Sequence, residues 1–419
     1  MAVCWFNTDQ DNRYRCTYTF EDDAIIIMAE YDSFGEYPYV VENGFKRVSI
    51  GTISEDKRDI LIVDYEEKIS YLVKNAFVTG LQNRFGTYDG VSITSFKSYE
   101  FFSHRDTEVL INLSERPKCS ALRIFSKDFI SFLGADSVTQ QSEDDKWVIL
   151  LKRNTESIDF YIETTKIKSI KYNSNWDQTT NWKEGAIIID IFPYVEIQFK
   201  RRQPYSDVYK FVYEFELYMQ LYSQERFKVD NISLKVNDLY LGYKCSTRKF
   251  NNKSQKNTID CDLPSFLKAC YQNVDYAFTK KNWLRNIPYV IDVYYRNIED
   301  NYLIYYKFIE CYYKSKGFVK TFVSTAIVNN YQDGNYTENE LLKISREIVC
   351  LRNHYIHSGY YIKNNSLKIS KPKKDKRYIN FNPYTININP QWVRLRTDML
   401  NQICIDIIYR EILGFNNYR

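Results

Sequence analysis

The spacing of apolar residues changes once along this chain, near residue 245, and this change constrains the fold more than any other feature. Before it, apolar residues alternate or form short β-branched runs, which are typical of strands. After it, they recur at three- and four-residue intervals, which predicts amphipathic helices. The pattern therefore predicts an α+β multidomain protein, with a β-rich N-terminal domain followed by an all-α bundle.

Short runs in the first part, separated by Gly, Asn, Asp and Ser, predict strands. These runs cover residues 45–53, 58–65, 91–96, 107–113, 147–153, 157–164, 186–192 and 194–200. Their spacing is typical of a sandwich or an irregular barrel. Within this part we expect one helix, from Tyr205 to Ser223 after Pro204, and a further strand pair at 232–244.

The domain boundaries follow from the same change of pattern. We expect a β-rich N-terminal domain over residues 1–245, with a sensor or regulatory role, and a polar linker over 246–262 that lacks periodic apolar residues. A helical domain is expected over 263–419, and its final helix should run from about Gln391 to Gly414. With 419 residues, the chain is long enough to build two hydrophobic cores.

Charge is unevenly distributed along the chain. Residues 1–150 carry 16 Lys and Arg against 25 Asp and Glu, whereas the remainder carries 41 against 28. A polyanion would therefore bind in the second part. No export signal and no apolar run long enough for a bilayer is apparent, and the nine cysteines form no CxxC pair. We expect a cytoplasmic protein with reduced thiols and no membrane partner.

Several familiar chemistries lack their motifs in this sequence. It contains no GxxxxGK[ST] loop, no GxGxxG and no HExxH, and it has only three histidines. The acidic triplets at Glu21–Asp23 and Glu143–Asp145 are interpreted as turn or surface acids and not as cation ligands. We therefore expect neither a metal nor a cofactor.

The stretch LRNHYIHSGY, residues 351–360, holds two of the three histidines. Its helix should begin at a capping box made by Thr337 and Glu340 and end at Gly359. At about 100° per residue, four apolar residues share one stripe that should face the core. These residues are Ile344, Ile348, Leu351 and Tyr355.

The polar sector of the same helix faces away from this stripe. Arg352 lies at the edge of the stripe, whereas Asn353 and His357 fall on the polar side, together with Val349 and Ile356. A histidine satisfied within the core is therefore disfavoured. The helix geometry leaves two interpretations open: a solvated polar face without chemistry, and a functional site.

The segment RNHYIHSG resembles the R-x4–6-H motif of the HEPN superfamily, in the form of an arginine, a polar residue, three variable residues and a histidine. A β-rich N-terminal part followed by a helical bundle is similar to the ApeA-like HEPN proteins of bacterial phage defence. The motif covers six residues, and the bundle resemblance covers residues 263–419. For the N-terminal part, the resemblance rests on domain order alone.

This resemblance implies a metal-independent endoribonuclease of abortive infection that cleaves RNA, with tRNA among the candidate substrates. The active site would be shared by two HEPN domains, in a homodimer or a higher homo-oligomer. Arg352 would hold the phosphate through its planar donor fork, and His357 would act as general acid or base. Asn353 would orient one of them, and His354, at a variable position, receives no role.

A basic segment follows the motif and could bind RNA phosphates without reading the base sequence. Its candidate RNA-binding residues are Lys371, Lys373, Lys374, Lys376 and Arg377. The alternative interpretation of this segment is a solvated loop. For the whole protein, the alternative is a non-catalytic HEPN-like module that binds RNA or protein. A carbohydrate or a phage-derived trigger bound by the N-terminal domain would be compatible with either function.

Overall fold

The computed structural model describes most of the chain. The described residues are 2–6, 11–21, 24–31, 39–42, 45–48, 57–83, 92–113, 116–129, 137–143, 146–152, 166–181, 186–223, 227–244, 261–276, 279–281, 283–291, 297–318, 321–331, 336–358, 366–372 and 376–415. Strands dominate up to residue 244 and helices from residue 263 onward, so the protein is α+β. None of the helices in these ranges is long and apolar enough to span a bilayer.

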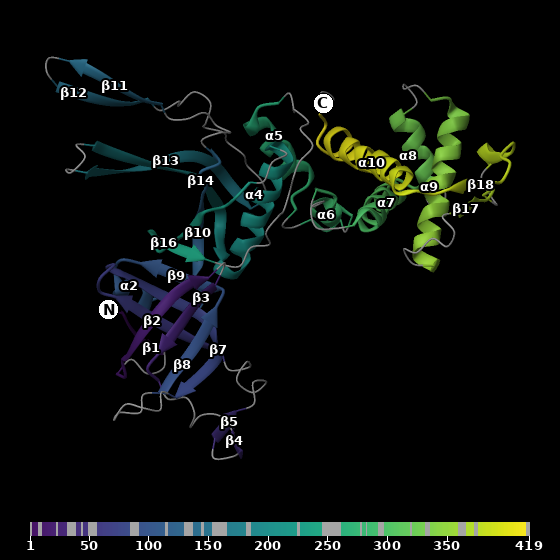
Figure 1. Cartoon of the computed structure of the whole chain (residues 1–419). Coiled ribbons are helices and arrows are strands. Elements are labelled where there is room, and N and C mark those ends of the chain that lie inside the picture. The colour runs from purple at the N-terminus through teal and green to yellow at the C-terminus, as the bar shows by residue number, and fades with distance from the viewer. Residues whose placement is uncertain are drawn as a thin grey trace. The chain divides into compact units, whose positions relative to one another are not determined.

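Six antiparallel strands of the N-terminal part close into a barrel (Figure 1). They are β1 (Ala2–Phe6), β2 (Tyr14–Glu21), β3 (Ala24–Ala29), β6 (Lys57–Asp64), β7 (Ile69–Asn83) and β8 (Ser92–Ser98). The barrel closes because β7 pairs with β6 along one edge and with β8 along the other. The prediction of a sandwich or irregular barrel is thus resolved in favour of a barrel.

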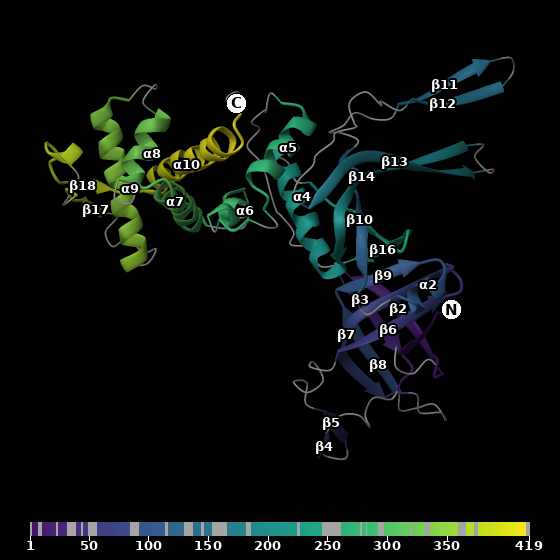
Figure 2. The same ribbon diagram turned by 180° about the vertical axis from the view of Figure 1, so that it is seen from behind.

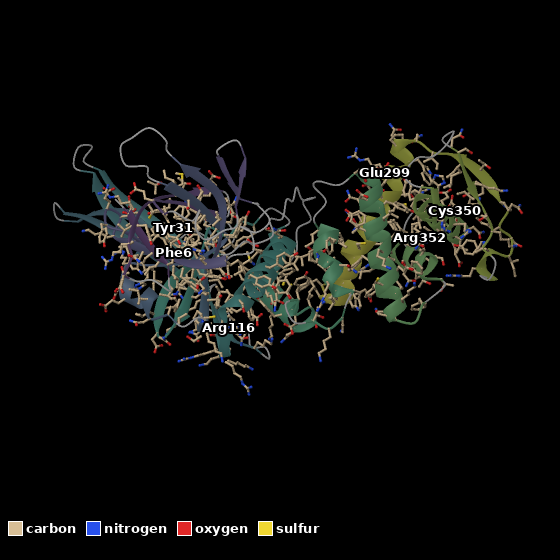
Figure 3. All side chains as sticks on the ribbon, turned by 90° about the horizontal axis from the view of Figure 1, so that it is seen from below. Phe6, Tyr31, Arg116, Glu299, Cys350 and Arg352 are labelled. Carbon is tan, nitrogen blue, oxygen red and sulfur yellow. The ribbon has the colours of Figure 1, made fainter. Side chains whose placement is uncertain are left out.

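Side chains fill the barrel interior, as the alternation of each strand requires. Cys4 and Phe6 of β1, Ile25 and Ile27 of β3 and Ile62 of β6 belong to one buried apolar cluster. The ring centre of Phe6 lies 5.5 Å from that of Phe96 within this cluster. Tyr31 packs against the cluster, with its ring centre 4.7 Å from that of Phe6; both of these residues are labelled in Figure 3. The barrel is therefore a packed core.

Further strands extend the sheet from the β7 edge through β9 (Figure 2). In spatial order they are β9 (Glu100–His104), β16 (Leu239–Lys244), β15 (Asn231–Val236), β10 (Lys118–Phe125), β14 (Ala186–Pro204) and β13 (Ile167–Asn181). Helix α4 (Val208–Ser223), preceded by a 3-10 turn at Tyr205–Asp207, packs against this extension through Phe211 and Phe215. The predicted helix and the predicted strand pair at 232–244 are both confirmed.

The predicted strand at 107–113 is wrong, because the chain forms the short helix α2 (Thr107–Ile111) there. The side chain of Asp106 accepts a hydrogen bond from the backbone N–H of Glu108 at 3.0 Å, and the N–H of Asn112 closes the turn on the carbonyl of Glu108. An N-cap of this kind stabilises a helix by about 1 kcal/mol. Here it prevails over the strand propensity of the apolar run, which depends on context.

Other predicted strands appear at least in part. β5 (Phe45–Val48), which pairs with β4 (Tyr39–Glu42), covers the start of the run at 45–53. β12 (Lys146–Lys152) pairs with β11 (Ser137–Glu143). The runs at 186–192 and 194–200 form the single long strand β14, and the run at 157–164 lies outside the described residues.

Helices dominate the C-terminal part (Figure 1). They are α5 (Leu263–Asn273), α6 (Ile287–Ile291) after a 3-10 turn at Leu284–Asn286, α7 (Ile298–Ser315), α8 (Phe322–Tyr331), α9 (Glu338–Ser358) and α10 (Pro390–Asp406), which continues as a π-helical segment (Ile407–Ile412). The end expected at Gly414 is confirmed, since this glycine has φ +80° just beyond the last helical turn. A hairpin of β17 (Ser366–Ile369) and β18 (Tyr384–Asn387), with a 3-10 turn at Lys376–Tyr378 between them, lies between α9 and α10 in sequence and was not predicted.

The contacts divide the chain into two compact units. A β-rich unit comprises residues 1–216 and 228–248, and a helical unit comprises 217–227 and 249–419. Residues 217–227, which the predicted domain 1–245 included, thus group with the helices. The predicted linker 246–262 lies outside the described residues except for Cys261 and Asp262, whose carboxylate caps α5 by accepting from the N–H of Ser265.

Candidate functional site

Helix α9 carries the Arg-Asn-His motif, and its predicted beginning is confirmed. The Glu340 carboxylate accepts hydrogen bonds from the N–H and the hydroxyl of Thr337, each at 2.8 Å, and the Glu340 N–H donates to that hydroxyl at 3.4 Å. This reciprocal pairing is a capping box. The predicted core stripe is also confirmed, since all four of its residues are buried. The expected stop at Gly359 lies outside the described residues, and α9 is described to Ser358.

Arg352 lies against α7 and not on the open face of α9. Its guanidinium carbon is 5.5 Å from the ring centre of Tyr306, a distance at which a cation is attracted by the aromatic face. Figure 3 shows Arg352 beside α7, the helix whose first turn holds Glu299. Among the described residues, the only hydrogen-bond partner of Arg352 is the side-chain oxygen of Asn353, at 3.1 Å. Asn353 therefore helps to hold the guanidinium that the motif supplies.

The carboxylate of Glu310, one turn after Tyr306 on α7, has two lysines close to it. Lys314 donates to it at 2.6 Å, and the ammonium of Lys307 lies 3.7 Å away. Burial alone would raise the pKa of Glu310, but the hydrogen bond from Lys314 and the charges of Lys314, Lys307 and Arg352 lower it below its usual value. The carboxylate is therefore ionised at neutral pH, and more than one cation surrounds it.

Tyr306, whose ring faces Arg352, contributes an uncharged phenol to this arrangement. Burial raises the pKa of Tyr306 above its usual range, and the nearby charges of Arg352 and Arg346 offset only part of that increase. Arg346, also on α9, donates to the carbonyl of Ser370 and to its hydroxyl, the latter at 3.0 Å. The charges of two arginines of α9 thus act on one phenol, and among the described residues no carboxylate is bonded to either arginine.

His357 is exposed, as the helix geometry predicts, and so is Asn353. No hydrogen bond joins His357 to Arg352 in the described part of the chain, and five positions place the two side chains about 140° apart around the helix. Ile356, beside His357, is 50% exposed, and Val349 is half-buried. His354 is half-buried and its ring centre lies 6.4 Å from that of Tyr355. The chain therefore presents the arginine and the histidine on different sides of α9.

The basic segment after the motif is only partly described. Lys371 donates to the carbonyl of Ile379 at 2.5 Å, and Arg377 donates to the hydroxyl of Ser324 on α8. Both residues therefore stabilise the fold of the helical unit. Lys373 and Lys374 lie outside the described residues, as does the side chain of Lys376.

The α7 residues around Arg352 were missed at the level of sequence. Lys307, Glu310 and Lys314 have i, i+3 and i+7 spacing within the predicted helical domain, which places them on one face of a helix. That spacing was a usable signal, but it does not reveal which other helix the face meets. Within the described ranges, no group of three or more His, Cys, Asp or Glu side chains could hold a metal ion.

Comparison of the chain with family models, with curated proteins and with solved structures finds no match.

Proposed function

We propose that this protein is a metal-independent endoribonuclease that acts in the cytoplasm in defence against phage, with Arg352, Asn353 and His357 in its active site. The observation that carries the proposal is Arg352, which is positioned by Tyr306 and Asn353 and has no carboxylate bonded to it among the described residues. A guanidinium in that state retains donors for a phosphate. The HEPN-like motif supplies a histidine on the same helix.

The chemistry requires few protein groups. The 2′-hydroxyl of RNA loses its proton to a base, its oxygen bonds to the adjacent phosphorus, and the bond from phosphorus to the 5′ oxygen breaks as that oxygen takes a proton. Arg352 would stabilise the charge on the five-coordinate phosphate, and Asn353 would keep Arg352 in place. His357 would carry a proton, since the ordinary histidine pKa of about 6.5 permits both acid and base roles at neutral pH.

The same geometry supports a homodimer, or a higher assembly of dimers. Arg352 and His357 lie on different sides of α9, so a second copy of the helix would bring one protomer's histidine to the other's arginine. The half-exposed side chain of Ile356 would gain from burial in such an interface. Mixing Arg352→Ala with His357→Ala protomers under subunit exchange should restore cleavage, whereas a fully active monomer would contradict the shared site.

The alternative is a non-catalytic module that binds RNA or protein. The separation of Arg352 from His357 around α9 is equally compatible with it, because a binding surface needs no shared reaction centre. The two functions differ in one variant: His357→Ala should abolish cleavage while RNA binding persists if the protein is a nuclease. If the wild-type protein binds RNA without cutting it, the alternative is correct.

The experiment that tests the nuclease is incubation of the full-length protein with total cellular RNA in EDTA, followed by mapping of the cleavage ends. We expect 2′,3′-cyclic phosphate and 5′-hydroxyl ends, and the same assay identifies the RNA cleaved, including any tRNA. Strict dependence on Mg²⁺ with 3′-hydroxyl products would disprove the mechanism. Repeating the assay with phage lysate tests whether the β-rich unit responds to a trigger.

A further inference from the structure

We infer that the face shared by α7 and α9 binds the sugar–phosphate backbone of RNA, through what we call the α7–α9 cation cluster: Lys307 and Lys314 of α7 with Arg346 and Arg352 of α9. The inference rests on the proposed function, because it identifies RNA as the partner of this surface. It differs from the sequence-based expectation, which assigned RNA binding to residues 371–377.

The cluster carries a surplus of positive charge that its own contacts do not neutralise. Within the described part of the chain, Glu310 is the one carboxylate that pairs with these cations: Lys314 donates to it at 2.6 Å, and Lys307 lies 3.7 Å away. The charge of Arg352 also acts on Glu310, and those of Arg352 and Arg346 both act on Tyr306. Three of the four cations thus act on the Glu310 carboxylate, and the two arginines act on the neutral phenol of Tyr306. In a buried structural network the charges would be paired, so this imbalance favours an anionic partner.

The exposure of the groups also suits a polyanion. The carboxylate side of the arrangement is buried, since the Glu310 side chain is only 12% exposed, whereas the Lys307 and Lys314 side chains are 66% and 44% exposed. Solvent therefore meets the ammonium groups and not the acid. The two lysines are two helical turns apart, about 10 Å along α7. A polyanion that runs along α7 would therefore meet two separate cations.

Lys371 and Arg377, by contrast, both contact main-chain or side-chain oxygens of the helical unit itself. Their loss would disturb the docking of the segment as well as remove charge. The exposed lysines of α7 carry no such constraint in the described part of the chain, where Glu310 is their one hydrogen-bond or ion-pair partner. They are therefore the cleaner choice for an experiment on phosphate binding.

The test measures the affinity of full-length His357→Ala protein, which should not cut its ligand, for a fluorescent single-stranded RNA of mixed sequence over a range of salt concentrations. Adding Lys307→Ala and Lys314→Ala should flatten the log–log salt dependence by about 1.4, at roughly 0.7 for each phosphate of the single strand that a lysine no longer neutralises. The charge-preserving pair Lys307→Arg and Lys314→Arg should restore the slope. The matched control, Lys268→Ala with Lys343→Ala on exposed positions of α5 and α9, should leave it unchanged.

The outcomes separate this inference from the proposed function. An unchanged slope in the α7 double variant, with RNA cleavage intact in the wild type, overturns the inference and leaves the nuclease standing. A flattened slope without any wild-type cleavage supports the cluster and rejects the nuclease. If poly-glutamate binds through the same lysines and RNA does not, the partner is an acidic protein segment and the RNA assignment is wrong.

Discussion

Each unit of the protein holds an arginine against tyrosine rings. In the β-rich unit, the guanidinium carbon of Arg123 on β10 lies 3.4 Å from the ring centre of Tyr240 and 4.7 Å from that of Tyr194. Its Nε donates to Glu196 at 2.9 Å, and that carboxylate also accepts from the Tyr240 hydroxyl at 2.7 Å and from the Gln198 amide. The positive charge of Arg123 is therefore neutralised by the carboxylate of Glu196, to which it is bonded.

Arg352 of the helical unit shows the other arrangement. It lies 5.5 Å from one tyrosine ring, and its hydrogen-bond partner among the described residues is the uncharged side chain of Asn353. Its charge acts on the Glu310 carboxylate, which already bonds Lys314 and lies 3.7 Å from Lys307. Both arginines are positioned by aromatic rings, but only Arg123 is neutralised. Holding an arginine in place and neutralising its charge are therefore separate properties, and an arginine that is held in place without a bonded carboxylate keeps its donors for a ligand.

The largest difference between the two arginines should appear in catalysis. Arg352→Ala should slow RNA cleavage by about 10²–10³-fold, because a charged donor to the transition state is removed. It should lower the free energy of unfolding by less than about 1 kcal/mol, the value of a partly exposed cation–π contact. Single-turnover cleavage and urea unfolding measure the two effects.

Arg123→Ala is the matched control for this prediction. It should leave cleavage per folded molecule unchanged while lowering the free energy of unfolding by about 1–3 kcal/mol, since Glu196 is left with its charge partner removed. Equal losses of cleavage in both variants would mean that the comparison does not separate function from structure.

A third arginine sharpens the comparison within the helical unit. Arg396 of α10 donates through Nε and Nη2 to Glu347 of α9, at 3.0 and 2.6 Å, and the hydroxyl of Tyr384 donates to the same carboxylate at 2.8 Å. Both ionic side chains are 11% exposed. Glu347→Ala should therefore lower the free energy of unfolding by about 3–5 kcal/mol, because a buried charge loses its partner.

Glu310→Ala is the corresponding change at the α7–α9 cation cluster, and urea unfolding should show a smaller loss because the lysines that it releases are exposed to water. A larger loss than that of Glu347→Ala would show that the cluster is a structural network and not a binding surface.

The smallest expected effect is the dependence of stability on pH through Glu196. Burial would raise its pKa, but the hydrogen bonds from Gln198, Tyr240 and Arg123 lower it below its ordinary value of 4.5. The folded state therefore binds this proton less readily than the unfolded state, so Glu196 stabilises the fold above pH 4.5 and this contribution is lost as the pH falls through the folded pKa. Urea unfolding at neutral and acidic pH should show a shallower acid loss in Glu196→Gln, and an unchanged profile would contradict the assignment.

Elements with strong local signals were predictable from the sequence. Helix α9 was anticipated with its capping box and its core stripe, because Thr337, Glu340 and the period of the apolar residues are read from neighbouring positions. The strand pair β15–β16 was predictable for the same reason. Its turn at Asn237 and Asp238 adopts positive φ, of 47° and 68°, which these residue types tolerate well. The failure at 107–113 came from a single side chain, Asp106, whose capping bond prevails over an apolar run.

By itself, then, the sequence determined that strands dominate before residue 245 and helices after it, which face of α9 is buried, and which residues form the Arg-Asn-His motif, because backbone propensity, capping and periodicity act over a few residues. Only the tertiary structure decided that the strands close into a barrel and that Arg352 lies over Tyr306 near Glu310. Such features depend on contacts between segments far apart in the chain. One example is the hydrogen bond from the Tyr302 hydroxyl to the Ile348 carbonyl, which joins α7 to α9 across 46 positions. Local spacing places a side chain on a helix face but does not specify what that face meets.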